Sequence, residues 1–448
     1  MSPNRAEAKT ILRLALPVVS TQVAFMLMGV IDTLMVSRLG TRALAAATLG
    51  NLWVFGTFVF FMGLLMGLDP IISQAHGARD GARVGLALQR GLVLSLLASL
   101  PLAALWALTG PVLRLAGQEA DLAALAQGFA VVQIPSIPAF LAFTAMRQYL
   151  TGRGIMKPAM WIAWAANVVN LFFNWVLIYG HLGFTARGVM GSGMATAIAR
   201  VFMLFLLTAF IYWGRLHEGA WTGWTRRAFE LRGLVEVLAF GVPVAAQIGL
   251  EVWGFQVATL LAGKLSATAL AAHSIVLTVA SFSFMFPLGI SIAAATRVGN
   301  LIGAREPEAA ERAAWVAIAL GAGVMSAFGV AFFFSRHALP GLWAPAPDVL
   351  AAAAAILPIA AAWQIFDGTQ AVACGIMRGM GDTRPAAWFN LAGYFGMALP
   401  LGAWLAFRRG WGLPGIWWGL TLALAVVALM LVRRLRVHGP ATVTPLAR

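Results

Sequence analysis

The chain alternates long apolar stretches with short polar ones. A helix needs about 20 mainly apolar residues to cross a bilayer, and twelve stretches reach that length with few charges inside them. The segments between them are short, the longest being the one before Leu234. The pattern predicts an all-α membrane protein with twelve transmembrane helices, at residues 11–36, 43–70, 86–109, 122–146, 157–180, 188–212, 234–262, 269–296, 313–335, 349–374, 385–407 and 413–432.

The composition agrees with a lipid environment. The 448 residues are 61% hydrophobic and 10% charged, with a mean hydropathy of +0.85, whereas soluble domains are about 45–50% apolar and about 25% charged. A soluble enzyme is thereby excluded. The single cysteine, Cys374, permits no disulfide within the chain. Phosphate-loop, zinc-protease and nucleophile-elbow motifs are missing, so we expect no enzymatic activity and no cofactor.

The basic residues indicate how the chain is oriented. With both termini placed in the cytoplasm, most of the 31 lysines and arginines fall in cytoplasmic segments, as the positive-inside rule requires. The formal net charge of +15 is then a topology signal, and we expect no nucleic-acid partner. The first apolar run is too long for a signal-peptide core and is expected to remain as a helix.

An internal repeat divides the chain into two halves. At an offset of 226, Pro17 matches Pro243, and the segments 43–46 and 77–80 match 269–272 and 303–306; further on the offset is 227, with Gly152 matching Gly379. Six helices per repeat give both halves the same orientation in the membrane. We therefore predict two pseudo-symmetric six-helix lobes, a parallel repeat typical of secondary transporters. The lobes are residues 1–212 and 234–448, the latter with a short cytoplasmic tail, joined by a cytoplasmic linker at 213–233.

Three carboxylates lie clearly inside predicted spans, Asp32, Glu251 and Asp367, and Asp69 sits at the cytoplasmic end of the second span. A charged residue at the centre of a bilayer costs about 2.5–3.5 kcal/mol, so these side chains are expected to face a cavity or one another. In the repeat register Glu251 matches Phe25, seven residues before Asp32. Each lobe thus has its own acidic position, at a different depth.

Uncharged polar residues accompany them. Asn167, Asn170 and Asn174 form one stripe on the fifth span, with Thr196 on the sixth as a plausible neighbour, and Gln256 follows Glu251 on the seventh. Such amides either contribute to a polar site or hold helices together by hydrogen bonds. Arg200 on the sixth span pairs with a carboxylate or reaches the cytoplasmic surface, and the sequence assigns it no transport role.

The sequence resembles the multidrug and toxic compound extrusion (MATE) family, especially its NorM-like bacterial branch, over nearly the whole chain. The resemblance is carried by LALPVVSTQVAFMLMGVIDTLMVSRLG (14–40), the segment 241–304, and QIFDGTQAVACGIMRGMGDTRPA (364–386). It implies a cation-coupled antiporter of the bacterial inner membrane, a monomer driven by Na+ or H+, that exports cationic or amphipathic organic compounds. An alternative within the same superfamily is a flippase for lipid-linked precursors or polysaccharides.

The same resemblance implies roles for individual residues. Glu251 and Asp367 match the pair that holds the coupling cation in the NorM-like branch, so Na+ is a candidate for binding at this pair. Asp32 matches the acidic residue of the first helix. Asn170, Asn174 and Thr196 match the remaining N-lobe positions of archaeal-type members. Archaeal-type members have a second aspartate at the position of Asn174. Eukaryotic members have a second glutamate on the seventh helix, and in this chain Gln256 takes its place.

Overall fold

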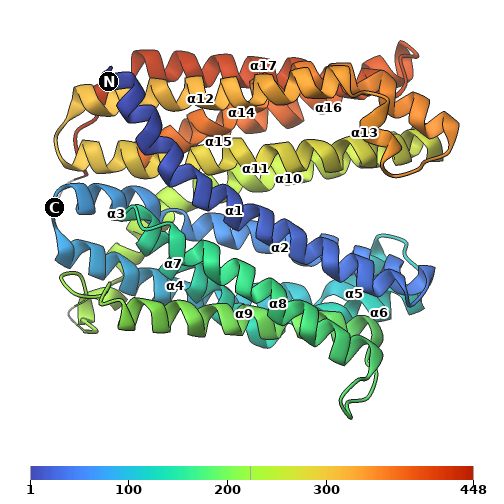
Figure 1. Cartoon of the computed structure of the whole chain (residues 1–448), viewed down its shortest axis with the longest axis horizontal. Helices are drawn as coiled ribbons and strands as arrows, with labels where there is room; N and C mark the ends of the chain where they lie inside the picture. Colours follow the sequence, from blue (N-terminus) through green and yellow to red (C-terminus); the bar gives the residue numbers. More distant parts are fainter. Residues whose placement is uncertain (1, 222, 447–448) are drawn as a thin grey trace. The chain divides into compact units, whose positions relative to one another are not determined.

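The computed structural model describes residues 2–221 and 223–446, which form helices and no strand (Figure 1). Within these residues, eleven helices or helix pairs are long and apolar enough to cross a membrane. They confirm eleven of the predicted spans, and their bounds are Pro3–Ser37, Thr41–Gly77, Gly81–Ala107, Ala120–Gly152, Lys157–Tyr179, Gly188–Trp213, Leu231–Leu265, Ala267–Gly303, Pro307–Phe334, Pro347–Met380 and Leu413–Thr442.

The remaining predicted span, 385–407, is helical but not one continuous α-helix. Its path runs through α15 (Arg384–Leu391), the π-helical η3 (Ala392–Ala398), α16 (Leu399–Ala403) and the π-helical η4 (Trp404–Arg408). Pro400 lacks an N–H for the ladder, and three glycines weaken it further. The missing side chain of Gly393 also makes room for Val427 of α17 (Leu413–Val437). The twelve-helix architecture therefore holds, with one mixed α/π member.

Two other spans contain breaks. The second consists of α2 (Thr41–Leu65) and α3 (Leu68–Gly77), which separate at Gly67. A Cβ on Gly67 would collide with the backbone of α10 (Leu231–Leu265) at Val237, so only glycine permits this close approach. The fourth span is split into α6 (Ala120–Val131), the 3-10 turn η1 (Ile134–Ser136) and α7 (Ile137–Gly152), because Pro135 and Pro138 interrupt the hydrogen-bond ladder.

The chain groups into two compact units, one of residues 20–245 and one of residues 1–19 with 246–448. Their boundaries, 19 and 245, differ by the repeat offset of 226. The sequence-based division at 213–233 stays a prediction. Unit 20–245 contains the second half of α1 (Pro3–Ser37), α2 to α9 and the start of α10, including α4 (Gly81–Ala107), α5 (Thr109–Leu115), α8 (Lys157–Tyr179), α9 (Gly188–Trp213) and the 3-10 turn η2 (Arg226–Phe229).

In the other unit, α14 (Pro347–Met380) is the central helix. It packs against α11 (Ala267–Gly303), α12 (Pro307–Phe334) and α17. Gly375 and Gly379, one turn apart, face the backbone of Ser291 and Ala295 on α11, where a Cβ would collide. This spacing of small residues lets membrane helices approach closely. Two short elements complete the unit: α13 (Ala338–Gly341) and η5 (Pro440–Thr442).

The repeat is also visible in local backbone geometry. Arg79 and Arg305, which match at the offset of 226, both adopt a left-handed conformation, with φ of 59° and 61°. Each sits directly after a helix, in the turn that begins the next one. Non-glycine residues rarely adopt positive φ. The shared geometry confirms that the two halves follow one structural plan.

Candidate cation site

The first polar cluster lies in unit 20–245 and is centred on Asp32 of α1. Asn174 donates to Oδ1 of Asp32 at 2.5 Å, and Thr196 donates to Oδ2 at 2.8 Å. Asn174 also donates to the side-chain oxygen of Asn170 at 3.0 Å. The structure thus brings together four of the residues selected from the sequence, from α1, α8 and α9. Both carboxylate oxygens have a protein donor, so Asp32 is stabilised without any ligand.

Asn167 has a different environment from the other two asparagines of the stripe. Its side-chain nitrogen donates to the backbone oxygens of Ala24 on α1 and Ala163 on α8, both at 2.9 Å. It therefore ties α8 to α1, the interhelical role that polar side chains play within membranes. The stripe combines a structural residue with two members of the Asp32 cluster.

Arg200 lies one turn beyond Thr196 on α9, among aromatic rings. Its guanidinium carbon is 5.0 Å from the ring centre of Phe140, 5.5 Å from that of Trp106 and 5.9 Å from that of Phe58. These distances are within the range of cation–π attraction. Arg200 also interacts electrostatically with Asp32. No carboxylate lies within ion-pair distance of Arg200 in the described residues, so the pairing left open by the sequence stays a prediction.

The second polar cluster lies in the other unit and contains Glu251 of α10 and Asp367 of α14. The two carboxylates are close enough to interact electrostatically, and Gln370 lies within hydrogen-bonding reach of Glu251. Asp367 is 1% exposed. Within the described residues, neither of its carboxylate oxygens has a hydrogen-bond partner. An ionised carboxylate in this environment needs a bound cation or water, since its desolvation is otherwise not offset.

Other buried polar atoms around this pair also lack partners in the described part of the chain. They are Oε1 of Gln370, the hydroxyl of Tyr394 and Nε2 of Gln364. Tyr394 interacts electrostatically with both carboxylates. Native interiors leave few polar groups unsatisfied, and a local concentration of them marks a place for water or an ion. Glu251, Asp367, Gln370 and Tyr394 together present only oxygen atoms for this purpose, the ligand type that hard cations prefer.

Gln256 does not join this group. It lies five residues after Glu251 on α10, which places it about 140° around the helix at 100° per residue. In residues 2–221 and 223–446 it makes no hydrogen bond to either carboxylate. Phe255, about 40° from Glu251, faces the cluster instead, and its ring centre is 5.7 Å from that of Tyr394.

The repeat register shows how the two units differ chemically. Glu251 matches Phe25 at the offset of 226, and Asp367 matches Phe140 at the offset of 227. In unit 20–245 these two phenylalanines form an edge-to-face pair with ring centres 6.5 Å apart. The same two positions therefore meet within each unit. One unit has two carboxylates there, and the other has two aromatic rings, of which Phe140 lies next to Arg200 and Phe25 next to Arg147.

Sequence reasoning missed Tyr394 and Asn390. Asn390 accepts a hydrogen bond from Gln370 at 2.9 Å and so holds that glutamine beside Glu251. Both residues lie on the mixed α/π span, where a regular helical wheel misplaces side chains. One available signal was the repeat, because Tyr394 matches Asn167 of the polar stripe at the offset of 227. The chain has only four tyrosines, which makes such a match informative.

The ligand set differs from that of a transition-metal site. Among the residues that the structure describes, no group of three or more His, Cys, Asp or Glu side chains is placed to hold a metal. Two carboxylates with amide and phenol oxygens instead suit Na+, or a proton shared between acids. An all-helical membrane fold of two repeats, with ionisable groups buried inside, has the architecture of a secondary transporter.

Comparisons with known proteins identify the family. The MatE family model matches residues 17–176 and 243–404. The probable multidrug resistance protein NorM of Burkholderia pseudomallei is 36% identical over 94% of this chain and 91% of its own length. Multidrug and toxin extrusion protein 2 of Mus musculus is 32% identical over 96% of this chain and 74% of its own. The crystal structure of a eukaryotic MATE transporter superposes with a TM-score of 0.90 at 25% identity, covering 97% of this chain and 96% of that one. The chain belongs to the MATE family, as the sequence resemblance indicates.

Proposed function

We propose that this protein is a cation-coupled antiporter that exports cationic or amphipathic organic compounds. The names of the relatives, multidrug resistance and multidrug and toxin extrusion proteins, support the export of drugs and toxins. The coupling ion is Na+ or H+, and the protein acts as a monomer in the bacterial inner membrane with both termini in the cytoplasm. The basic segments support that orientation.

One observation carries the proposal: Asp367 is buried beside Glu251, and its carboxylate oxygens have no partner in the described residues. A cation that enters this cluster offsets one of its negative charges, and its departure leaves that charge uncompensated. A cationic drug competes for the same negative charge. Such competition couples inward cation movement to drug export, provided that access alternates between the two sides of the membrane.

Transport into vesicles tests the proposal. Purified protein in liposomes is given a Na+ gradient or, separately, a pH gradient, and uptake of a fluorescent organic cation is measured. One gradient is expected to drive uptake in the wild type, and Glu251→Gln and Asp367→Asn are expected to abolish it. Asp121→Asn, the same change at an exposed carboxylate paired with Arg42, serves as the control. Gradient-driven uptake that persists in both site variants would contradict the assignment.

A further inference from the structure

Buried polar groups without partners extend beyond the acidic pair in the unit of residues 1–19 and 246–448. In the described part of the chain, neither Nδ1 of His273 on α11 nor the indole N–H of Trp417 on α17 has a hydrogen-bond partner. The two residues are 0% and 1% exposed. Native interiors rarely leave such groups unpaired, so each one calls for a partner from outside the chain, of which water is the commonest.

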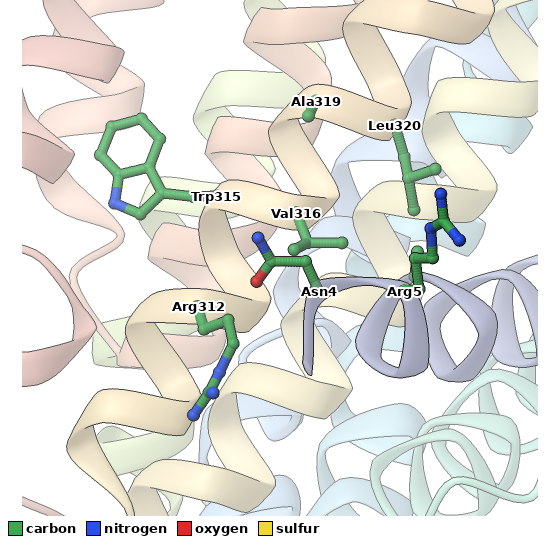
Figure 2. A pocket seen from close by; sticks show the side chains of 8 residues that line it. Asn4, Arg5, Arg312, Trp315, Val316, Ala319 and Leu320 are labelled. Atoms are coloured by element: carbon green, nitrogen blue, oxygen red, sulfur yellow. The ribbon is translucent and has the colours of Figure 1, made fainter. Parts of the chain in front are cut away.

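The surface groove of this unit is a different place. It has a volume of about 510 Å³ and lies between the start of α1 and α12 (Figure 2). The guanidinium of Arg5 lies beside Leu320, and that of Arg312 lies at the opposite end and points away. His273 and Trp417 are not among the residues that line this groove. Their unpartnered groups therefore belong to the interior of the unit.

The two unpartnered groups are chemically complementary. The hydroxyl of Thr259 on α10 donates to the backbone oxygen of Phe255 at 2.9 Å, and it lies 3.1 Å from Nε2 of His273. Since its one hydrogen is already used, this hydroxyl accepts from an Nε2–H, which leaves Nδ1 of His273 as the acceptor nitrogen. The indole of Trp417 can only donate.

One water molecule satisfies both groups, by donating to Nδ1 of His273 and accepting from the indole N–H of Trp417. The ring centres of the two residues are 5.7 Å apart. Two hydrogen bonds of about 2.9 Å in series, through one water oxygen, cover such a separation. Water-mediated contacts of this kind are nearly as favourable as direct hydrogen bonds.

A continuous stack of side chains connects this place to the acidic pair. Phe255 follows Glu251 by one turn on α10, and its ring centre is 5.7 Å from that of Tyr394 and 6.0 Å from that of Trp363. The ring of Trp363 in turn is 6.4 Å from that of Trp417. In the middle of the stack, the Tyr394 hydroxyl has no partner in the described residues. Unpartnered polar groups thus recur from the acidic pair to Trp417.

The stack leads from the middle of the span toward one end of the helices. Glu251 is 14 residues from the end of α10, about 21 Å at 1.5 Å per residue. His273 is only six residues from the start of α11, about 9 Å, and Trp417 is four residues from the start of α17, about 6 Å. In the orientation proposed above, both of these helices begin on the side opposite to the cytoplasm.

We propose that one water molecule bridges His273 and Trp417, and that it forms the outer end of a hydrated route by which the coupling cation exchanges between the acidic pair and the side opposite to the cytoplasm. The role of the route rests on the proposed antiport function, whereas the bound water does not. A proton or a partly hydrated Na+ needs polar contacts along its way, because a wholly apolar path would remove its hydration without replacement. The Tyr394 hydroxyl supplies the next such contact inward.

Radiolytic labelling of the full-length protein in detergent tests for the water. Brief X-ray exposure forms hydroxyl radicals from bound water, and these oxidise the buried side chains beside it. Trp106 is the internal reference, because it is 0% exposed and its indole N–H donates to Thr57 at 3.0 Å. Mass spectrometry is expected to show several-fold faster oxidation at Trp417 and Tyr394 than at Trp106. Equal rates at Trp417 and Trp106 would overturn the proposal.

Two variants of His273 separate loss of the water from a general change in packing. His273→Leu removes the acceptor, so oxidation of Trp417 is expected to fall to the rate of Trp106. His273→Asn keeps an acceptor oxygen near the position of Nδ1, and the rate at Trp417 is expected to stay at the wild-type value. If His273→Leu does not fold, Trp417→Phe removes the donor instead, and oxidation of His273 should fall. An unchanged rate after removal of either partner would contradict the bridge.

The vesicle assay with an ion gradient tests the route. His273→Leu is expected to slow gradient-driven uptake about fivefold, the factor for one hydrogen bond of about 1 kcal/mol. The cation-dependent rise in melting temperature should stay at the wild-type value, because the acidic pair is intact. His181→Leu, the same change at an exposed histidine stacked on Trp175 at 4.2 Å, is the control and should leave uptake unchanged.

The outcomes distinguish the route from the proposed function. Uptake by His273→Leu at the wild-type rate would overturn the route while leaving the antiport function in place. A lower melting-temperature response in His273→Leu would also overturn it, because His273 would then act on the acidic pair itself. A wild type without gradient-driven uptake would refute the proposed function and, with it, the role of the route, and the labelling would still decide whether the water is bound.

Discussion

Asp367→Asn is expected to make the protein more stable while removing its response to the coupling cation. In the wild type, the Asp367 carboxylate is buried and has no hydrogen-bond partner in the described residues. A buried polar group left unsatisfied costs about 1–3 kcal/mol, and more when it is charged. Asparagine has nearly the same shape, carries no charge and supplies two N–H donors for the neighbouring Glu251. Without a coupling cation, the variant should therefore gain about 1–3 kcal/mol in free energy of unfolding.

Adding the coupling cation should stabilise the wild type relative to Asp367→Asn. A ligand that binds only the folded state stabilises it by about 2.7 kcal/mol at a hundred times its Kd. For units of this size, roughly 2–4 °C of melting temperature corresponds to 1 kcal/mol, so the wild type is expected to gain roughly 5–10 °C. Na+ produces the gain if Na+ is the coupling ion, and a lower pH produces it if the proton is. The variant has lost one of the two acids and should not respond to either.

Differential scanning fluorimetry of the purified proteins measures both effects, with Na+ exchanged for choline at constant ionic strength and with pH varied in choline. Asp121→Asn is the control, because that carboxylate is 82% exposed and exposed ion pairs contribute only about 0–1 kcal/mol. The reasoning would be refuted if Asp367→Asn melted below the wild type in choline, or if both proteins showed the same cation-dependent shift.

Three further predictions use the same measurement. Asp32→Asn should destabilise the protein by about 1.5–3 kcal/mol, since it removes a carboxylate that accepts two hydrogen bonds; an increase in melting temperature would contradict this. Arg200→Met in the Asp367→Asn background should restore a cation response, because Asp32 loses its positive neighbour; a flat cation titration would argue against this role of Arg200. Gly379→Leu, which collides with Ala295, should lower stability by at least about 1–3 kcal/mol. Gly323→Leu, with nothing within 4 Å of its Cβ position, should change stability little, and equal losses in the two variants would exclude the packing explanation.

Helix number and repeat were predictable because each rests on a signal that extends over many residues. A span needs only length and low charge, and the repeat appears as several matches at one offset. The breaks were less predictable. Pro135 and Pro138 break the fourth span, whereas Pro17 and Pro243 lie inside continuous helices, so a proline alone does not predict a break. The π-helical turns around Tyr394 depend on packing against α17 as well as on Pro400 and the glycines of that span.

The candidate site was predictable for charged residues and less so for neutral ones. Asp32, Glu251 and Asp367 are conspicuous because a carboxylate in a span is costly. Gln256 illustrates the limit, since its nearness in sequence to Glu251 says nothing of its position 140° away around the helix. Asn167 looked like Asn170 and Asn174 in the sequence, but its partners are backbone oxygens. Only the hydrogen-bond partners of each asparagine distinguish a structural amide from one that belongs to the polar site.

The contrast between Asp32 and Asp367 indicates how work is divided between the two repeats. Asp32 receives hydrogen bonds on both oxygens and has Arg200 as a nearby positive charge, so its charged form is stabilised without a ligand. Asp367 has neither kind of support from the described residues and shares its burial with a second acid. A cation gains most free energy where the protein has left negative charge uncompensated. The coupling ion should therefore bind first at Glu251 and Asp367. The same difference predicts that Asp32→Asn lowers the free energy of unfolding, whereas Asp367→Asn raises it when the coupling cation is absent.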